Sequence, residues 1–110
     1  MDREEILSME EGKLLDLVHE KFNVTLRGLE DSRYLSVAWE IVEKLEKKGW
    51  TTDIRVSAGS KSVDGYKFEG GGPGTIFAQY GHRPNFRCVT EGICKTALIA
   101  CEKNLNSGFC

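Results

Sequence analysis

The apolar residues of the chain change their spacing near residue 50. Before that point they recur every three or four positions, which is typical of amphipathic helices. Residues 33–48 show the strongest pattern, with Ser32 in front as a predicted N-cap and Gly49 behind as a predicted stop. We therefore expect a helix over 33–48, with an apolar stripe made of Leu35, Ala38, Ile41, Val42 and Leu45.

Two shorter helices are predicted nearer the N-terminus. Residues 2–8 open with Asp2 and carry Glu5 three positions later, which resembles a capping box. Residues 13–22 form an amphipathic helix with an acidic outer face. Residues 23–31 have no helical period, so we expect a loop there. The apolar stripe of the second helix contains Leu14, Leu17 and Val18.

After residue 50 the period becomes two, which indicates strands. The alternating segments are 51–58, 63–69 and 75–80, and the short loops between them predict an antiparallel meander. A last helix is expected to begin with Thr90 as its N-cap. Its predicted buried stripe consists of Ile93, Ala97, Leu98, Cys101 and Leu105.

The order of these elements predicts one α+β domain over residues 1–110. A sheet with an apolar face needs a cover, which the helices that start near Ser32 and Thr90 can supply. Apolar residues on both faces of the third strand indicate that the N-terminal helix covers the second face. We therefore expect a three-layer α/β/α sandwich around a small antiparallel sheet.

Composition and charge restrict the function classes. The 110 residues are 40% hydrophobic and 29% charged, as in a folded domain. The 15 Lys and Arg residues stand against 17 Asp and Glu residues, a net charge of −2 that argues against a nucleic-acid partner. No uncharged apolar run approaches the ~18 residues of a membrane span. The opening MDREE lacks the pattern of a secretory signal, so we expect a cytoplasmic protein that avoids membranes.

The four cysteines are spaced too widely for the short zinc-binding motifs. Cys94 and Cys101 are seven positions apart, so on a helix they share a face, and we expect buried thiols. In a reducing cytosol we expect no disulfide. The sequence predicts no metal and no cofactor.

The glycine-rich segment 69–74 raises the question of phosphate binding. A nucleotide-binding loop needs a following helix, and a Walker loop also needs a lysine, whereas Gly70–Gly74 is followed by Thr75 and a predicted strand. The segment is therefore interpreted as a connection between strands, or alternatively as a lip that contacts a ligand or partner. The residues assigned to such a ligand or partner site are Gly71, Gly72, Tyr80, His82, Arg83 and Arg87.

The sequence offers no catalytic constellation. His19 has no ligand or base partner at helical spacing, and the serines lack a GxSxG elbow. The paired carboxylates lie on predicted helix faces beside lysines, which is typical of a solvated surface. We therefore predict no catalytic residue and no enzymatic activity.

The helix–strand–strand–strand–helix order from Ser32 to Asn104 is also that of double-stranded RNA-binding domains. Those modules carry lysines at the start of the last helix. Here the same position holds Glu91, with only Lys95 nearby. The topology permits RNA binding, but the charge argues against it.

Three stretches resemble the phage ABA sandwich domain, a family of small phage and prophage proteins: REEILSMEEGKLLDLVHEKF, AWEIVEKLEKKGW and ICKTALIACE. The resemblance implies the same three-layer α/β/α sandwich. It brings no activity and no functional residues. The sequence departs from the family at Val24–Asp31, at 57–84 and at Gly92.

These observations lead to one preferred function and two alternatives. We expect a non-enzymatic phage or prophage accessory protein in the cytoplasm of the host bacterium, a protein-interaction module that acts on a host or phage factor or forms a homo-oligomer. The first alternative is a protein that sequesters a small molecule or nucleotide with the Gly70–Gly74 loop. The second is an RNA-binding module.

Overall fold

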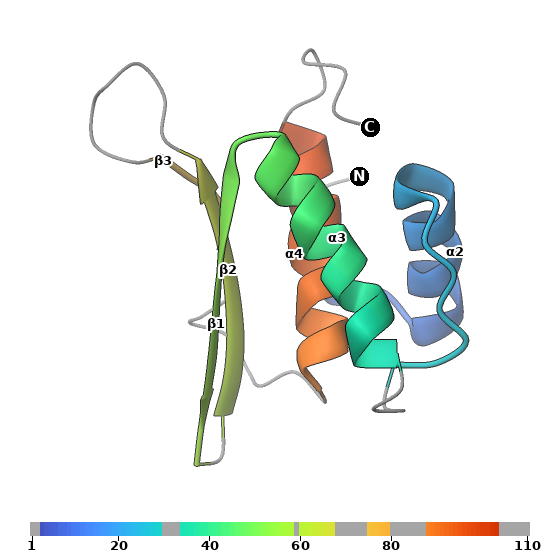
Figure 1. Ribbon diagram of the computed structural model, residues 1–110. Helices are drawn as coiled ribbons and strands as arrows, with labels where there is room; N and C mark the ends of the chain where they lie inside the picture. The colour runs from blue at the N-terminus through green and yellow to red at the C-terminus, as the bar shows by residue number, and fades with distance from the viewer. Residues whose placement is uncertain (1–2, 30–33, 59, 68–74, 80–87, 104–110) are drawn as a thin grey trace.

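The computed structural model describes residues 3–29, 34–58, 60–67, 75–79 and 88–103 (Figure 1). These residues form helices and one antiparallel sheet, so the predicted α+β class is confirmed. In chain order the elements are α1 (Arg3–Leu7), α2 (Glu11–Phe22), α3 (Leu35–Lys47), β1 (Trp50–Ser57), β2 (Ser60–Lys67), β3 (Thr75–Gln79) and α4 (Val89–Lys103).

The sheet has the strand order β1-β2-β3, and both pairings are antiparallel. In the first pairing Ile54 lies opposite Val63, and Ser57 lies opposite Ser60. The second pairing contains a shift of register between Gly65 and Tyr66. Within the described residues β1 pairs only with β2, so β1 is an edge strand of this sheet.

The helices lie on one side of the sheet (Figure 1). α3 packs on β1 and α4 packs on β2 and β3, whereas α1 and α2 contact α4. The layers of the described residues are therefore the sheet, then α3 with α4, then α2. The predicted sandwich places the sheet in the middle and the N-terminal helix on its second face, and that placement of the helix is wrong. The apolar stripe of α2 (Leu14, Val18 and Phe22) instead lies in the same hydrophobic core as the buried residues of α4.

α4 explains this difference because it is buried on every side. All side chains from Thr90 to Cys101 are buried, including Thr96 and Ile99, which lie off the predicted stripe. Cys94 is buried, as predicted. A helix that offers contact surface all round can hold a sheet on one side and helices on the other. The predicted stripe residues Ile93, Ala97, Leu98 and Cys101 are confirmed as core.

The segment after α2 also contributes to the core. Asn23 ends the helix in the left-handed conformation, with φ 56°, and its N–H donates to the carbonyl of His19. In the predicted loop that follows, Val24, Leu26 and Leu29 are buried. These three residues are spaced too irregularly along the sequence to predict a strand. Sequence reasoning missed this part of the core.

Helix boundaries differ from the predicted caps at two places. α3 begins at Leu35 after Tyr34, which makes no capping hydrogen bond with its side chain. α4 already includes Val89, so Thr90 is a helical residue and not the N-cap. Ser32 and Asp2 lie outside the described residues. Gly49 ends α3 with φ 88°, as predicted.

Candidate interaction surface on α3 and β1

The residues predicted to form a ligand or partner site lie outside the part of the chain that the structure describes. They are Gly71, Gly72, Tyr80, His82, Arg83 and Arg87. The candidate surface described below was not predicted as a site, and it consists of residues from α3 and β1.

α3 carries two apolar stripes rather than one. The first stripe, Ala38, Ile41 and Leu45, is buried against the core. The second stripe runs beside it, because positions 35, 39 and 42 follow the same three- and four-residue spacing. In this second stripe Leu35 is 43% exposed and Trp39 is 49% exposed, far more than large apolar side chains in a core.

The second stripe lies on the flank of α3 that faces away from α2. At 100° per residue, Leu35 and Trp39 fall on one side of the buried stripe and Lys44 on the other. Lys44 donates to the carbonyl oxygen of Phe22 at the end of α2. The exposed stripe is therefore on the opposite flank, and β1 is the strand on which α3 packs.

β1 adds apolar side chains to the same region. Ile54 lies opposite the fully buried Val63, so it is on the face of the sheet that α3 covers, and Val56 shares that face. Ile54 is partly buried, but Val56 is 63% exposed. The chain reverses at Gly49, so Val56 belongs to the part of β1 near the start of α3.

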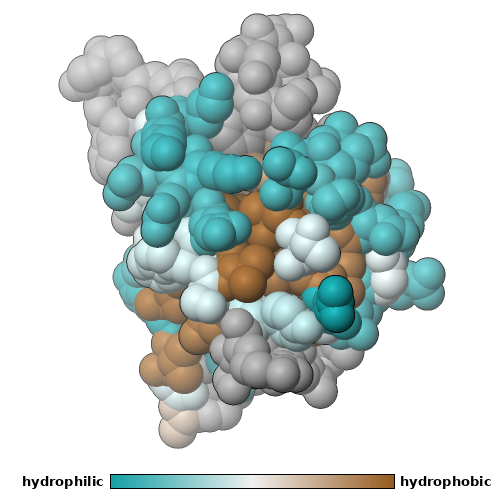
Figure 2. Space-filling view, turned by 45° about the vertical axis from the view of Figure 1, so that its right-hand side comes forward, coloured by the Kyte–Doolittle hydropathy of each residue, from teal (hydrophilic) through white to brown (hydrophobic). Residues whose placement is uncertain are grey.

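We call these five residues the α3–β1 surface: Leu35, Trp39, Val42, Ile54 and Val56. Of the five, Leu35, Trp39 and Val56 are the exposed large apolar side chains. Figure 2 is turned so that the α2 side of the molecule comes forward, and there too apolar side chains are open to the surface within a border of hydrophilic ones. Scattered exposed apolar residues are ordinary, but a contiguous set beside an edge strand marks a contact surface. The α3–β1 surface therefore has the chemistry of a protein interface.

The opposite face of β1 is charged. Arg55 Nη2 lies 3.3 Å from Asp53 Oδ2, with side-chain exposures of 75% and 34%. Such an exposed ion pair contributes little to stability, so its members can exchange partners at little cost.

A hollow of about 340 Å³ lies where α2 and α3 end. Its lining is basic, but the C-terminal ends of helices carry partial negative charge that attracts lysines. Lys44 is in addition bound to the Phe22 carbonyl. The lysines are thus explained by the helix ends. The lining residues are Glu20, Lys21, Phe22, Asn23, Lys44, Lys47 and Lys48.

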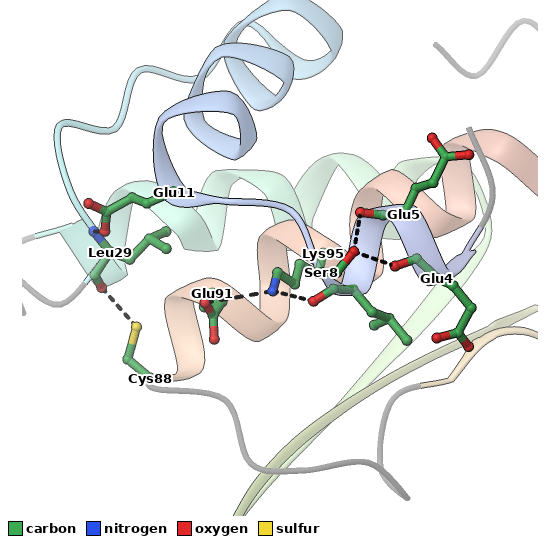
Figure 3. A network of polar contacts seen from close by, with 9 residues as sticks. Glu4, Glu5, Ser8, Glu11, Leu29, Cys88, Glu91 and Lys95 are labelled. Carbon is green, nitrogen blue, oxygen red and sulfur yellow. Dashed lines mark hydrogen bonds and ion pairs between the residues drawn. The ribbon is translucent and has the colours of Figure 1, made fainter.

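The buried polar side chains of α4 hold its neighbours in place (Figure 3). Lys95 Nζ lies 3.7 Å from Glu91 Oε2 and donates to the carbonyl oxygen of Leu7 at 2.7 Å, which attaches the end of α1 to α4. Thr96 Oγ1 donates to the carbonyl oxygen of Val63 at 3.2 Å, which attaches β2. These groups satisfy buried backbone carbonyls, so their role is structural.

The loop after α2 is attached in the same way. Cys88 Sγ donates to the carbonyl oxygen of Leu29 at 3.0 Å, and the N–H of Leu29 donates to Glu11 Oε1 at 3.3 Å (Figure 3). Both polar groups of the Leu29 backbone are therefore paired with side chains, one from the start of α2 and one from the segment before α4.

The cysteines of α4 are not nucleophiles. Burial, with the neighbouring Cys88 and Glu91 adding to it, raises the pKa of the Cys94 thiol from 9.0 to about 12. A reactive cysteine needs the opposite shift, because the thiolate is the nucleophile. Cys101 is buried as predicted but is disulfide-bonded, so the prediction of a free thiol there is wrong.

Two further observations concern polar residues. His19 is exposed, and its Nδ1 lies 3.1 Å from Thr25 Oγ1. Glu91 and Lys95, the pair weighed for RNA contact, are 8% and 5% exposed. These two side chains are therefore not available to a phosphate backbone.

Within the described ranges, no three His, Cys, Asp or Glu side chains gather closely enough to hold a metal ion. The helices of the described residues are too short or too polar to cross a bilayer.

The comparisons with known proteins give no family for the chain. No protein-family model matches the sequence, and no curated protein or solved structure is significantly similar to it.

Proposed function

We propose that this chain is a non-enzymatic protein-interaction module that binds its partner through the α3–β1 surface. The single observation that carries the proposal is the exposure of Leu35, Trp39 and Val56 beside an edge strand. Tryptophan is among the residues most enriched at energetic centres of interfaces, and an edge strand offers unpaired backbone groups to a partner.

The non-enzymatic part of the proposal is supported by the state of the most reactive groups described. The Cys94 thiol is kept protonated by burial, and Lys95 and Glu91 are bound to each other inside the protein. Cys88 donates to a backbone carbonyl. Each of these groups has a structural task.

The proposal retains the sequence resemblance to the phage ABA sandwich proteins. On that basis the module works in the cytoplasm of a bacterial host, on a host or phage factor. The three-layer sandwich of that family stays a prediction, because the described helices all lie on one side of the sheet. The ligand site around the Gly70–Gly74 loop stays an alternative prediction.

Affinity capture with matched variants tests the proposal. The tagged chain, a Trp39→Ala variant and a Lys13→Glu variant are used as baits in lysates of infected and uninfected bacteria. Trp39 is at the proposed surface, and Lys13 is an exposed residue of α2 on another part of the molecule. We expect a protein, a second copy of the chain included, that the parent chain and the Lys13 variant retain and the Trp39 variant loses.

Two results would contradict the proposal. One is equal retention of every captured protein by the three baits, because the α3–β1 surface would then have no part in binding. The other is a chemical turnover that depends on a residue of the described chain. Circular dichroism of the Trp39 variant establishes that its fold is intact.

A further inference from the structure

The edge strand β1 has a charge pattern that is complementary to itself. Asp53 and Arg55 flank Ile54 on the outer face of the sheet, one on each side. If a second β1 lies antiparallel to the first with a twofold axis at Ile54, each Asp53 comes opposite an Arg55 of the other copy. Opposite charges directly across an antiparallel pair stabilise it.

We infer that the partner of the α3–β1 surface is a second copy of this chain, joined through β1 in the register centred on Ile54. The inference rests on the proposed function and gives it a specific partner. It produces one continuous sheet of two copies, in the order β3-β2-β1 and then β1-β2-β3.

The backbone of β1 fits this register. Hydrogen-bonded and non-hydrogen-bonded pairs alternate along an antiparallel ladder, and the pair that closes a two-residue hairpin is a hydrogen-bonded one. Ser57 and Ser60 are that closing pair. Counting back in twos from Ser57, the N–H and C=O groups of Ile54 and Val56 point to the open edge, where a second strand can bind them.

Charge distinguishes this register from its neighbours. The adjacent registers that use the same backbone groups are centred on residue 53 or residue 55. The first places two Asp53 carboxylates opposite each other, and the second does the same with two Arg55 guanidinium groups. Like charges directly opposite destabilise a strand pair, so the register centred on Ile54 is favoured.

The apolar side chains of the α3–β1 surface meet in the same arrangement. Trp39 lies eight residues before the end of α3, about 12 Å along the helix. Ile54 lies four residues after the start of β1, about 13 Å along the strand. Trp39 is therefore level with the twofold axis, where the two α3 helices come together over the joined strands. Trp39 and Leu35 of each copy are then covered by the other copy.

Charge-swap variants of the full chain test this register. Sedimentation equilibrium is measured from low micromolar to millimolar concentration, and non-reducing gels establish that no disulfide joins the copies. We expect the mass to rise from 12.3 kDa to twice that value. Asp53→Arg and Arg55→Asp should each weaken dimerisation at least tenfold, because like charges then face each other.

The decisive measurement is the dimerisation of chains in which the two charge changes are combined. The double variant D53R/R55D restores opposite charges across the axis, and so does a mixture of the two single variants. We expect both to dimerise within about threefold of the parent chain, a difference below 1 kcal/mol. Lys13→Glu should leave dimerisation unchanged. In a Trp50→Phe variant the emission of Trp39 should shift to the blue as the concentration rises.

Three outcomes would overturn the inference. A chain that stays monomeric at all concentrations has no such dimer. A dimer that D53R and R55D leave unchanged, or that the double variant fails to restore, uses another register or surface. A monomeric chain that retains a different protein in a Trp39-dependent way refutes the second copy as partner and leaves the proposed function standing.

Discussion

α4 and α3 lie side by side in the same layer but have opposite relations to their surroundings. α4 is buried on all sides, and even its Lys95 and Glu91 are enclosed. α3 buries one stripe and leaves Leu35 and Trp39 of a second stripe open to solvent. Both helices are rich in apolar residues, so hydrophobicity alone does not distinguish a helix at the centre of a fold from one at its edge.

What distinguishes them is the use of their polar groups. On α4 the polar side chains bind backbone carbonyls of α1 and β2, so they serve the interior. On α3 the charged residues Glu40, Glu43 and Glu46 are exposed to solvent. A buried polar side chain with partners indicates a structural element, whereas an apolar side chain without cover indicates a contact surface.

The largest effect is expected from a cavity in α4. Ile93→Ala removes a fully buried side chain and should lower the free energy of unfolding by about 4 kcal/mol, because the enclosed site cannot collapse. Leu35→Ala on α3 is the matched control and should change it by less than about 0.5 kcal/mol. Urea denaturation at a concentration where the chain is monomeric measures both. Equal losses would abolish the distinction between the two helices.

A smaller loss is expected when the buried ion pair is broken. Lys95→Met leaves Glu91 buried without its cation and should cost about 3 kcal/mol. The double variant with Glu91→Gln should regain part of this loss, because the remaining buried group is then neutral. A double-mutant cycle from denaturation curves gives the coupling, and additive single effects would show that the two side chains act independently.

The Cys94 thiol predicts a dependence of stability on pH. Its pKa is about 12 in the folded chain and 9.0 is its ordinary value, so between these values the unfolded chain loses a proton that the folded chain keeps. Stability should therefore fall as the pH rises above 9, by about 1.4 kcal/mol per pH unit. This slope is measured against a Cys94→Ala variant, in which it should be absent. Parallel slopes for the two proteins would refute the burial of the thiol.

The smallest effect on stability is expected at Trp39. Trp39→Ala should lower the free energy of unfolding of the monomer by about 1 kcal/mol, because only half of the side chain is covered in the single chain. Trp50 is 4% exposed, so acrylamide should quench it far less than Trp39. Quenching of Trp39→Phe and Trp50→Phe at low concentration separates the two. Similar quenching of both variants would mean that Trp39 is covered in the single chain.

The spacing of apolar residues predicted most of the helices and strands, but it did not predict how they are arranged in space. The helical spacing from residue 35 to residue 45 and the alternation after Trp50 correspond to α3 and β1 within a few residues. The position of α2 was missed because an apolar stripe shows that a helix needs cover but not which element supplies it. Sequence patterns likewise gave no signal that α4 is buried around Glu91 and Lys95, since an i, i+4 charge pair is usually a solvated one.

The candidate surface was also hidden in the pattern. Leu35 and Val42 fit the same spacing as Ala38 and Ile41, so the sequence pattern alone predicts one buried stripe that contains all four. The apolar face of α3 is wider than the area that α4 and β1 cover. The uncovered part of this face belongs to the α3–β1 surface. The width of an apolar stripe could have suggested this, because a helix at the edge of a layer buries only a narrow one.

The central position of α4 has a consequence for synthesis of the chain. α4 follows the other six elements, yet the sheet, α3, α2 and α1 all pack on it or on its direct neighbours. Lys95 reaches back 88 residues to Leu7. On the ribosome, α1 to β3 therefore emerge without the helix that completes their core, and a chain that stops before Val89 exposes apolar surface from every layer. Folding must wait for translation of α4, and truncated products should be substrates for proteolysis.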